Sequence, residues 1–432
     1  MTELEYKEII LNKFKKQKAI VNWFKLAIGK FFQLIFILLI MLLFTIPIFL
    51  ILCFRKMFLG IPMFSSSTIL GHNSKIIKIT TFNLKGHLLK HFSLIYQLLI
   101  GQIHFVGNSF LSDELESDEN ILLISKFGYP GIFNLWFIRE STKIAHEGLI
   151  VTELEYLATK SFKRDLSLII KTFPALLFRS SEQSYQEKLE IFDLEFDNIS
   201  MKEGLTLIEN TIDSDKKKKF FFVNPDCMNK LYKDDQYFSI LEKADYIFPD
   251  GIGISIACNI LKTPLLENVN GTDMLPFLCE MSEKKNYSLF LFGAKPGVAE
   301  KMKKKLEEKY TNLNIVGIRS GYFDWDRDSS SIVQEINDSQ ATILLVAFGV
   351  PLQEKWISEN FAKLKPNVLM GVGGLFDFYS GQMKRAPKWM REIGMEWFFR
   401  LIKEPKRMWK RYIIGNPLFI YRVYKWKKKK NR

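Results

Sequence analysis

The chain has 432 residues, of which 47% are hydrophobic and 25% charged, and it carries a formal net charge of +14. This length exceeds one ordinary core, so two or more domains are expected, and the charge indicates an anionic partner: a membrane surface, a nucleic acid or a phosphorylated substrate. The four cysteines are scattered without a CxxC pair, and all five histidines precede residue 150. These counts exclude a disulfide framework and a zinc motif and favour a reduced, cytoplasmic setting. They also exclude a histidine-dependent triad or metal site in the second half.

The strongest physical signal lies near the N-terminus, after a basic amphipathic stretch over residues 1–25. Residues 31–54 contain no charged side chain. A helix of this length would extend about 36 Å, enough to cross a hydrocarbon core of about 30 Å. Pro47 should kink that helix, and basic residues flank both of its ends. Because Lys and Arg favour the cytoplasmic side, this pattern predicts a kinked hairpin that enters and leaves one leaflet; a simple span is the alternative.

Shorter apolar runs follow, and they predict an α+β organisation for the first domain. Residues 75–82 have the pattern of a strand, 88–100 that of a helix, and 153–178 that of one long helix. The polar stretch 180–184 is the predicted linker. Three parts are therefore predicted: a membrane-associated domain over 1–185, a second domain over 186–383, and a basic, aromatic appendage over 384–432.

Residues 22–178 resemble the monotopic phosphoglycosyl transferases, which move a sugar phosphate onto polyprenyl phosphate. The resemblance rests on the proline-kinked segment and on three downstream motifs: 101–107 (GQIHFVG), 128–136 (GYPGIFNLW) and 164–172 (RDLSLIIKT). That family has an adjacent Asp-Glu pair before the first of these motifs, one residue acting as the nucleophile and the other as a magnesium ligand. Here no Asp or Glu lies between Glu8 and Asp113, and both roles require a carboxylate. We therefore expect a membrane-docking domain without phosphosugar transfer; the rival view is that Asp113 or Glu114 substitutes.

From residue 191 onward, apolar runs that end at glycine or at a polar turn alternate with amphipathic helices. The predicted strands are 218–223, 246–249, 288–292, 315–318, 341–348 and 367–372. Buried strands that alternate with helices form a parallel sheet covered on both faces. The sequence therefore predicts an α/β fold, with a Rossmann-like, mostly parallel sheet, helices on both of its faces and a basic helical appendage.

Asp250 follows the predicted strand 246–249 and precedes a turn that contains Gly251 and Gly253. Ligands bind at the carboxyl ends of parallel strands, so this carboxylate is placed to act as the general base of a sugar transfer. The alternative is that Asp250 caps the following helix.

Two further turns contain candidate ligand-binding groups. The turn 293–297 (GAKPG) can present backbone N–H groups to a phosphate, or it can simply begin a helix. Gln353 and Glu354 follow a glycine-proline turn, where an amide and a carboxylate can bind a nucleobase or sugar hydroxyls. The alternative for this pair is a polar helix start.

Residues 190–412 resemble the WecG/TagA/CpsF glycosyltransferases, the family of teichoic acid linkage-unit and enterobacterial common antigen transferases. The matching motifs occur in one order: 223–225 (VNP), 248–253 (FPDGIG), 269–274 (VNGTDM), 292–297 (FGAKPG), 349–354 (GVPLQE), 371–377 (GVGGLFD), 384–387 (KRAP) and 396–401 (EWFFRL). The resemblance implies an inverting, metal-independent transfer without a cofactor. It further implies a UDP-sugar as the donor, an N-acetylhexosamine such as N-acetylmannosamine as the sugar, and a polyprenyl-diphosphate-linked sugar as the acceptor.

The resemblance makes Asp250 the general base and places the donor pocket at the strand ends. The expected substrate-binding residues are Asn224, Gly251, Gly271, Thr272, Asp273, Gly293, Lys295, Gln353, Glu354, Gly373, Arg385, Arg400, Arg407 and Arg411. The arginines are the expected means of neutralising the leaving diphosphate. Departures from the family pattern at Phe222 and Asn268 leave the identity of the donor sugar open.

The predicted appendage contains 17 Lys or Arg and three Glu, interleaved with aromatic residues. This composition is typical of an interfacial membrane anchor. Nucleic acid is the alternative partner for any basic tail, but the apolar run 31–54 favours anionic membrane lipids. Together with the family resemblance, this predicts a location at the bacterial cytoplasmic membrane, with the catalytic domain on the cytoplasmic side. A homo-oligomer is left open. Two other functions are also open at this point: a bifunctional enzyme that adds phosphosugar transfer, and a non-catalytic scaffold of a glycan assembly complex.

Overall fold

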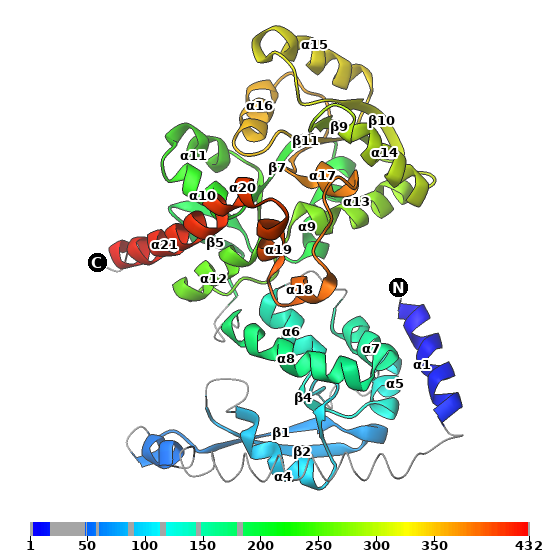
Figure 1. Cartoon of the computed structure of the whole chain (residues 1–432), viewed down its shortest axis with the longest axis vertical. Coiled ribbons are helices and arrows are strands. Elements are labelled where there is room, and N and C mark those ends of the chain that lie inside the picture. The colour runs from blue at the N-terminus through cyan, green and yellow to red at the C-terminus, as the bar shows by residue number, and fades with distance from the viewer. Residues whose placement is uncertain are drawn as a thin grey trace. The chain divides into compact units, whose positions relative to one another are not determined.

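The computed structural model describes residues 3–17, 48, 50–57, 60–84, 90–112, 118–143, 148–178 and 185–430 (Figure 1). The chain forms two compact units. The first comprises Met1–Ser141 and His146–Leu177, and the second comprises Thr142–Ala145 and Phe178–Arg432. Each unit has its own hydrophobic core.

The first unit combines two small sheets with helices. Strands β1 (Phe64–Leu70) and β2 (Ile76–Phe82) pair antiparallel around η1 (His72–Ser74). Strands β3 (His104–Val106) and β4 (Gly131–Phe133) pair in parallel. Its helices include α1 (Glu3–Gln17), η2 (Phe92–Leu94), α4 (Ile95–Leu99), α5 (Glu119–Phe127), α6 (Leu135–Thr142), α7 (Leu149–Thr159) and α8 (Phe162–Phe178).

The local predictions in this unit have different outcomes. The strand expected over 75–82 is confirmed as β2. The single helix expected over 153–178 is wrong, because the backbone leaves the helical region at Lys160 (φ −53°, ψ 126°) and a second helix begins at Phe162. Within 88–100, the described residues include the η2 turn and the short helix α4.

The predicted membrane segment lies largely outside the described residues. Residues 50–57 are helical, whereas 18–47 and 49 are not described, so the hairpin and the kink at Pro47 stay predictions. Among the described helices, none combines the length and the apolar character needed to traverse a bilayer. The predicted linker 180–184 also lies outside the described residues.

The second unit is built on a six-stranded parallel sheet, as predicted. Its strands are β7 (Lys218–Val223), β8 (Tyr246–Pro249), β9 (Ser288–Gly293), β10 (Asn314–Arg319), β11 (Ile343–Ala347) and β12 (Val368–Gly371). Their order in the sheet is β10-β9-β11-β12-β7-β8, and a short antiparallel hairpin, β5 (Lys188–Ile191) and β6 (Leu194–Asp197), lies beside β8. This order places the carboxyl ends of β11, β12, β7 and β8 next to one another.

Helices cover both faces of this sheet. Successive side chains of each strand point to opposite faces, where they enter two different cores, and helices complete each core. In β7, Phe220 and Phe222 belong to one core, and Phe221 and Val223 belong to the other. The helices of the Phe220 core are α9 (Met201–Asp213), α13 (Gly271–Lys285), α14 (Val298–Lys309) and α17 (Leu375–Tyr379). Those of the Phe221 core are α10 (Pro225–Leu231), α11 (Asp235–Glu242), α12 (Ile252–Leu261), α15 (Trp325–Asp338) and α16 (Leu352–Asn360).

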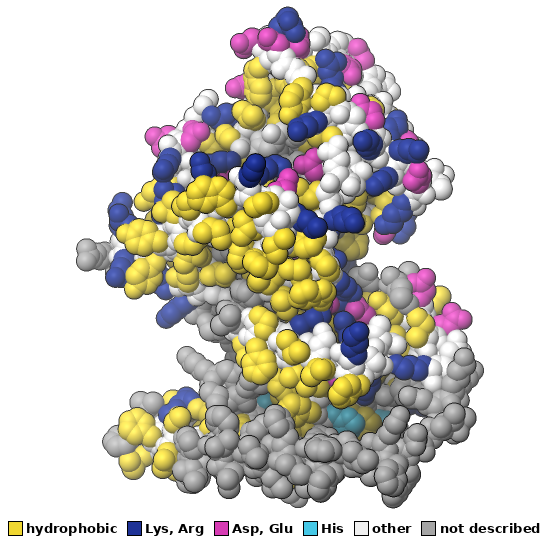
Figure 2. Space-filling model, in the orientation of Figure 1, with side chains coloured by type: hydrophobic (Ala, Val, Ile, Leu, Met, Phe, Trp, Pro, Cys, Tyr) yellow, Lys and Arg dark blue, Asp and Glu magenta, His cyan; other side chains and the backbone are white. Residues whose placement is uncertain are grey.

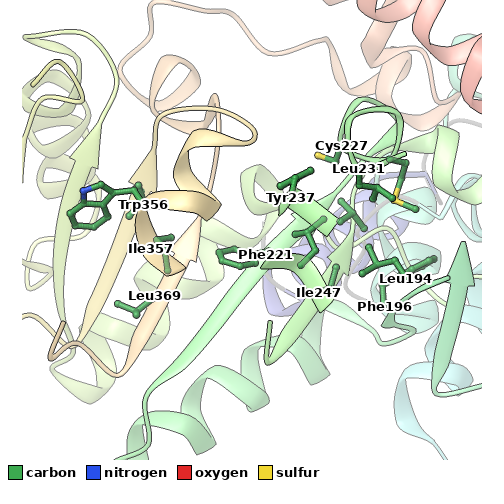
Figure 3. Packing of buried hydrophobic residues seen from close by; sticks show 14 of the residues in the cluster. Leu194, Phe196, Phe221, Cys227, Leu231, Tyr237, Ile247, Trp356, Ile357 and Leu369 are labelled. Atoms are coloured by element: carbon green, nitrogen blue, oxygen red, sulfur yellow. The ribbon is translucent and has the colours of Figure 1, made fainter. Parts of the chain in front are cut away.

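Figure 3 shows part of the Phe221 core, in which Phe221 and Ile247 come from paired strands. Tyr237, Trp356 and Ile357 cover them and their neighbours from the helices. All five side chains are 5% exposed or less, so the burial of apolar surface fixes the strand ends on which the site is built.

The C-terminal segment continues as short helices that return to the sheet. They are α18 (Lys388–Glu392), α19 (Glu396–Lys403), α20 (Pro405–Trp409), the π-helical η4 (Lys410–Gly415) and α21 (Asn416–Lys430). Helix α21 packs against α10 and α12, and its Phe419 and Val423 are fully buried in the Phe221 core. The basic tail is therefore helical, as predicted, and one face of its last helix belongs to the core.

Candidate active site

A cavity of about 920 Å³ lies at the carboxyl ends of β7, β8, β11 and β12. Residues of α19, α20, η4 and α21 form its opposite wall, and they include Arg400, Arg407 and Arg411. A smaller cavity of about 170 Å³ adjoins it, and Asp250, Arg400 and Arg411 line both. The position agrees with the general rule that ligands of parallel α/β sheets bind at the carboxyl ends of the strands.

Asp250 follows directly on β8 and is oriented by Asn224 at the end of the neighbouring strand β7. The Asn224 Oδ1 accepts hydrogen bonds from the backbone N–H groups of Asp226 (3.0 Å) and Cys227 (3.2 Å), which caps α10. The Asn224 Nδ2 is thereby directed to the Asp250 Oδ2, to which it donates at 3.4 Å. The helix cap thus fixes which end of the amide faces the carboxylate.

The alternative in which Asp250 caps α12 is wrong. The N-cap of α12 is Gly251, at φ +92°, and this helix has no side-chain capping bond. The Gly251 N–H instead donates to the Asn268 Oδ1 at 2.5 Å. A positive φ favours glycine at this position, and the turn leaves the Asp250 carboxylate lining the cavity.

Burial raises the pKa of the Asp250 carboxyl above its ordinary value of 3.8. The hydrogen bond from Asn224 and the positive charges of Arg411 and Arg400 act in the opposite direction, and the charge of Asp273 adds to the increase. Asp250 is therefore a stronger proton acceptor than an ordinary aspartate, as a general base requires.

The predicted arginines separate into two groups. Arg400 lies over the Phe378 ring at 5.0 Å, Arg411 has its Nε 3.8 Å from the Asp226 Oδ2, and Arg407 is 60% exposed. These three line the main cavity. Arg385 instead forms an ion pair of 2.6 Å with the Asp273 Oδ1 and lies 3.5 Å from Glu396.

Arg385 and Asp273, both expected to bind substrate, are paired with each other. The Asp273 Oδ2 also accepts from the Asn270 Nδ2 (2.7 Å), and the Asn270 Oδ1 caps α13 by accepting from the Asp273 N–H (2.9 Å). Both carboxylate oxygens of Asp273 are thus engaged within the protein. The pair joins the start of α13 to the segment before α18. Gly271 and Thr272 line the main cavity, and Asp273 lines the smaller one.

Gln353 connects two strand ends beneath the cavity. Its Oε1 accepts from the N–H groups of Gly349 (3.2 Å) and Gly373 (2.9 Å), which follow β11 and β12 and have φ values of +83° and +56°. Its Nε2 donates to the Glu354 Oε1 at 2.8 Å. The amide therefore holds the two glycine turns together, although part of Gln353 still lines the cavity.

Glu354 lies deeper, with no exposed surface, so the expected contact with substrate is wrong for this residue. Burial raises the pKa of Glu354 to about 7, and the hydrogen bond from Gln353 opposes this increase. Its Oε2 has no hydrogen-bond partner among the described residues. Glu354 supports Gln353 from below.

The turn 293–297 borders a neighbouring cavity of about 600 Å³. Lys295 lines it, but Gly293 does not: a Cβ on Gly293 would lie 2.6 Å from the Ala347 backbone, so glycine is needed there for close packing. The two cavities share Phe348, Gly349, Gly373, Gly374 and Arg407. Together they form an elongated site along the carboxyl edge of the sheet.

Several residues of the main cavity had no sequence signal strong enough to single them out. Lys230 of α10 donates to the Val350 carbonyl at 2.8 Å, and Arg422 of α21 donates to the Asn229 Oδ1 at 2.8 Å. Lys230 lies six residues after Asn224, so the start of α10 at a strand end was the available clue. Among the described residues, no group of three His, Cys, Asp or Glu is placed to hold a metal ion.

Comparison with known proteins places this site in a family. Residues 189–432 match the model described as "Glycosyl transferase WecG/TagA/CpsF family". The chain is 36% identical over 209 residues to an "N-acetylglucosaminyldiphosphoundecaprenol N-acetyl-beta-D-mannosaminyltransferase" of Bacillus subtilis (strain 168), a match that covers 48% of this chain and 79% of the relative. It is 29% identical over 250 residues to a protein of the same name from Staphylococcus aureus (strain MW2), covering 57% of this chain and 96% of the relative.

The family match begins at residue 189, so the resemblance of residues 22–178 to phosphoglycosyl transferases stays a prediction. The match spans more than half of the chain and every residue of the main cavity. The chain therefore belongs to the WecG/TagA/CpsF family of glycosyltransferases.

Proposed function

We propose that this glycosyltransferase moves N-acetylmannosamine from a UDP-sugar to N-acetylglucosaminyldiphosphoundecaprenol, with inversion at the anomeric carbon and without a cofactor. The names of the relatives support the sugar and the acceptor. The observation that carries the proposal is the position of Asp250, a partly buried carboxylate oriented by Asn224 in a cavity that also contains Arg400 and Arg411.

In the proposed reaction, a hydroxyl of the acceptor sugar attacks the anomeric carbon of the donor. Asp250 accepts the hydroxyl proton while the new C–O bond forms. The bond between the anomeric carbon and the UDP oxygen breaks, and UDP leaves with the bonding electrons. One positioned carboxylate is sufficient as the base of such a displacement, and its raised pKa suits this role.

The leaving diphosphate requires positive charge where its own charge develops. Arg400 and Arg407 supply guanidinium groups on one wall of the cavity, and the N-terminus of α13, with Gly271 and Thr272, lies on the other. A helix N-terminus carries a partial positive charge and free N–H donors. We assign the diphosphate to the space between them.

The neighbouring cavity of about 600 Å³ suits the nucleoside of the donor. Tyr322 and Phe348 offer aromatic rings for stacking, and Asp377 offers a carboxylate that can accept from ribose hydroxyls. Arg407 lines both cavities and so lies between the proposed nucleoside and diphosphate positions.

The test of the base is Asp250→Asn, which keeps the shape of the side chain and removes its ability to accept a proton. Transfer from UDP-N-acetylmannosamine should fall by about 100-fold or more, while UDP binding measured by calorimetry stays unchanged. Asp234→Asn is the matched control: it alters another acid of the same cavity, and asparagine can replace aspartate as the N-cap of α11. Full transfer by the Asp250 variant would refute the assignment.

We further propose that the appendage binds anionic lipids at the cytoplasmic face of the membrane. Phe398, Trp409 and Ile413 are 38–54% exposed and lie among lysines and arginines of residues 384–430. Figure 2 shows hydrophobic side chains gathered over α19 and α21, with Lys and Arg at the margins. Exposed aromatic and apolar side chains beside cations are typical of interfacial binding. Co-sedimentation with anionic but not with zwitterionic vesicles would support this binding mode, and equal binding to both would contradict it.

The first unit is proposed to dock on lipid without transferring a phosphosugar. Its Glu153 is buried and accepts from the Asn108 Nδ2 (2.6 Å) and the Ser109 N–H (3.1 Å), so this carboxylate is held inside the fold. Asp113 and Glu114 lie outside the described residues. The Asp250→Asn protein, incubated with polyprenyl phosphate, Mg²⁺ and UDP-sugars, should form no lipid-linked product; any product would refute this proposal.

A further inference from the structure

A groove without charged residues lies between α12 and α21, beside the catalytic cavity. Its volume is about 720 Å³, and its walls include Ile256 and Ile260 of α12 and Ile420 of α21. Its lining, which falls entirely within the described residues 185–430, includes no Lys, Arg, Asp or Glu. This is unusual in a segment as basic as residues 384–430.

The groove adjoins the cavity that contains Asp250. Five residues line both spaces: Ile252, Gly253, Trp397, Tyr412 and Asn416. On one side of these shared residues lie Asp250, Arg400 and Arg411, and on the other side only apolar, aromatic and amide side chains are present. A single ligand can occupy both spaces if one end of it is polar and anionic and the other is hydrocarbon.

We infer that this groove binds the part of the acceptor's polyprenyl chain that is nearest to its diphosphate. The inference rests on the proposed function, which supplies a sugar, a diphosphate and a hydrocarbon chain in that order. With the sugar hydroxyl at Asp250 and the diphosphate near Arg411, the chain continues past Trp397 and Tyr412 into the groove. A chain made only of carbon and hydrogen gains nothing from polar walls, and burial against isoleucine removes it from water.

The residues at the outer end of the groove support a chain that runs from Asp250 through the groove toward the membrane. Ile413, Tyr421 and Tyr424 line the groove and are 54%, 63% and 52% exposed. Tyrosine favours positions where one end of the ring is apolar and the other wet, as at a membrane interface. The groove thus opens on the surface proposed to meet the bilayer, so the chain could pass from lipid to Asp250 without crossing water.

Continuity with the catalytic cavity favours this ligand over a second copy of the chain. A protein segment seated between α12 and α21 would cover the shared residues Trp397 and Tyr412, and with them the approach to Asp250. An isoprenoid chain attached to the substrate would fill the same space and deliver its own head group to the base.

The experiment compares two acceptors with the same GlcNAc-diphosphate head, one with an undecaprenyl chain and one with a short, water-soluble alkyl chain. The full-length protein is assayed in detergent micelles. Ile256→Lys and Ile420→Lys each place a charge in the groove, whereas Ile402→Lys places one on an exposed residue of α19 outside it. Both groove variants should raise KM for the undecaprenyl acceptor at least about tenfold, the equivalent of about 1.4 kcal/mol. Their kcat/KM for the short acceptor should equal that of the wild type, and Ile402→Lys should keep the wild-type preference.

A second measurement does not depend on turnover. An acceptor with a photoreactive group on its first isoprene unit should label peptides that contain groove residues, from 252–261, from around Trp397 or from 412–424. Labelling confined to other segments would overturn the inference. So would groove variants whose KM and kcat/KM equal those of the wild type for both acceptors, or whose kcat/KM falls equally for both. A change in oligomeric state alone would overturn it as well. If the wild type uses neither acceptor, the proposed function itself fails; transfer with no effect of the groove variants would overturn only the groove.

Discussion

Replacing Glu354 by Gln should make the second unit more stable at pH 8 but leave its stability nearly unchanged at pH 4.5. The carboxyl of Glu354 is fully buried, one of its oxygens accepts from Gln353 at 2.8 Å, and the other has no partner among the described residues. Glutamine keeps an oxygen that can accept from Gln353 and carries no charge at any pH. The substitution therefore isolates the ionisation of this group.

The stability of the second unit falls as the pH rises because the folded state holds the Glu354 proton more tightly than the unfolded state does. The pKa of Glu354 is about 7 in the folded protein, against 4.5 for an ordinary glutamate. Below 4.5 both states hold the proton, and between 4.5 and about 7 the unfolded state releases it first, so stability declines as the pH rises. Above about 7 the loss is complete. A difference of about 2.5 in pKa, at about 1.4 kcal/mol for each pKa unit, gives a loss of about 3 kcal/mol.

Hydrogen exchange followed by mass spectrometry measures this loss of stability in the second unit separately from the first. Peptides from β11 and β12 report the opening free energy of the second unit, whereas a chain with two units need not unfold in one step. Relative to Glu354→Gln, the wild-type opening free energy should fall by up to about 3 kcal/mol between pH 4.5 and pH 8. Glu359→Gln is the control, because Glu359 is an exposed acid on the same helix.

A difference in opening free energy between wild type and Glu354→Gln that does not vary with pH would refute this prediction. A wild type that becomes more stable than the variant as the pH rises would refute it equally. Either result would mean that the buried carboxylate is stabilised by groups that the contacts of Gln353 and Glu354 do not reveal.

Three further outcomes are expected. Because a protonated Asp250 cannot accept the hydroxyl proton, kcat/KM should fall as the pH is lowered through the pKa of Asp250. The midpoint of this fall should lie above pH 3.8. A kcat/KM that does not change with pH in this acidic range would contradict the role of Asp250 as the base. Arg411→Ala should raise KM for the lipid acceptor at least about tenfold in steady-state assays while thermal melting still shows a folded protein; unchanged kinetics would remove Arg411 from the site. Arg385→Ala should lower the free energy of unfolding by about 2 kcal/mol in denaturant titrations. Because Arg385 and Asp273 pair at 2.6 Å, a double-mutant cycle with Asp273→Asn should show that the two substitutions are coupled. Independent effects of the two substitutions would contradict that pairing.

The fold of the second unit was predictable because its strands are continuous apolar runs that end at turns. Buried parallel strands have this pattern, and all six occur close to the predicted positions. The first unit was harder, since short strands and a helix break at Lys160 leave no comparable periodic signal. A two-residue break between helices depends on the packing around it, and a 26-residue helical pattern over 153–178 does not reveal it.

The candidate site was predictable in its residue types but not in their orientation. Arg385 and Asp273 were both expected to contact substrate; the sequence did not show that they form an ion pair with each other, in which Asp273 still lines the smaller cavity. Glu354 follows Gln353 in the chain, but only Gln353 lines the cavity, because adjacent residues of a helix point in different directions. A strand-end position indicates that a residue is near the site, and the neighbouring helices then decide what its side chain contacts.

The sequence by itself determined the parallel α/β fold, the acid at the end of β8 and the excess of cations in the C-terminal segment, because these depend on local patterns and on residue type. The tertiary structure decided what Asp250 is paired with. Sheet order sets β7 beside β8, so that the Asn224 amide, fixed by the cap of α10, faces the Asp250 carboxylate. The tertiary structure also places α21 against α12, so that an uncharged groove lies next to the Asp250 carboxylate. These contacts join residues far apart in the chain, and only the packing of the two cores brings them together.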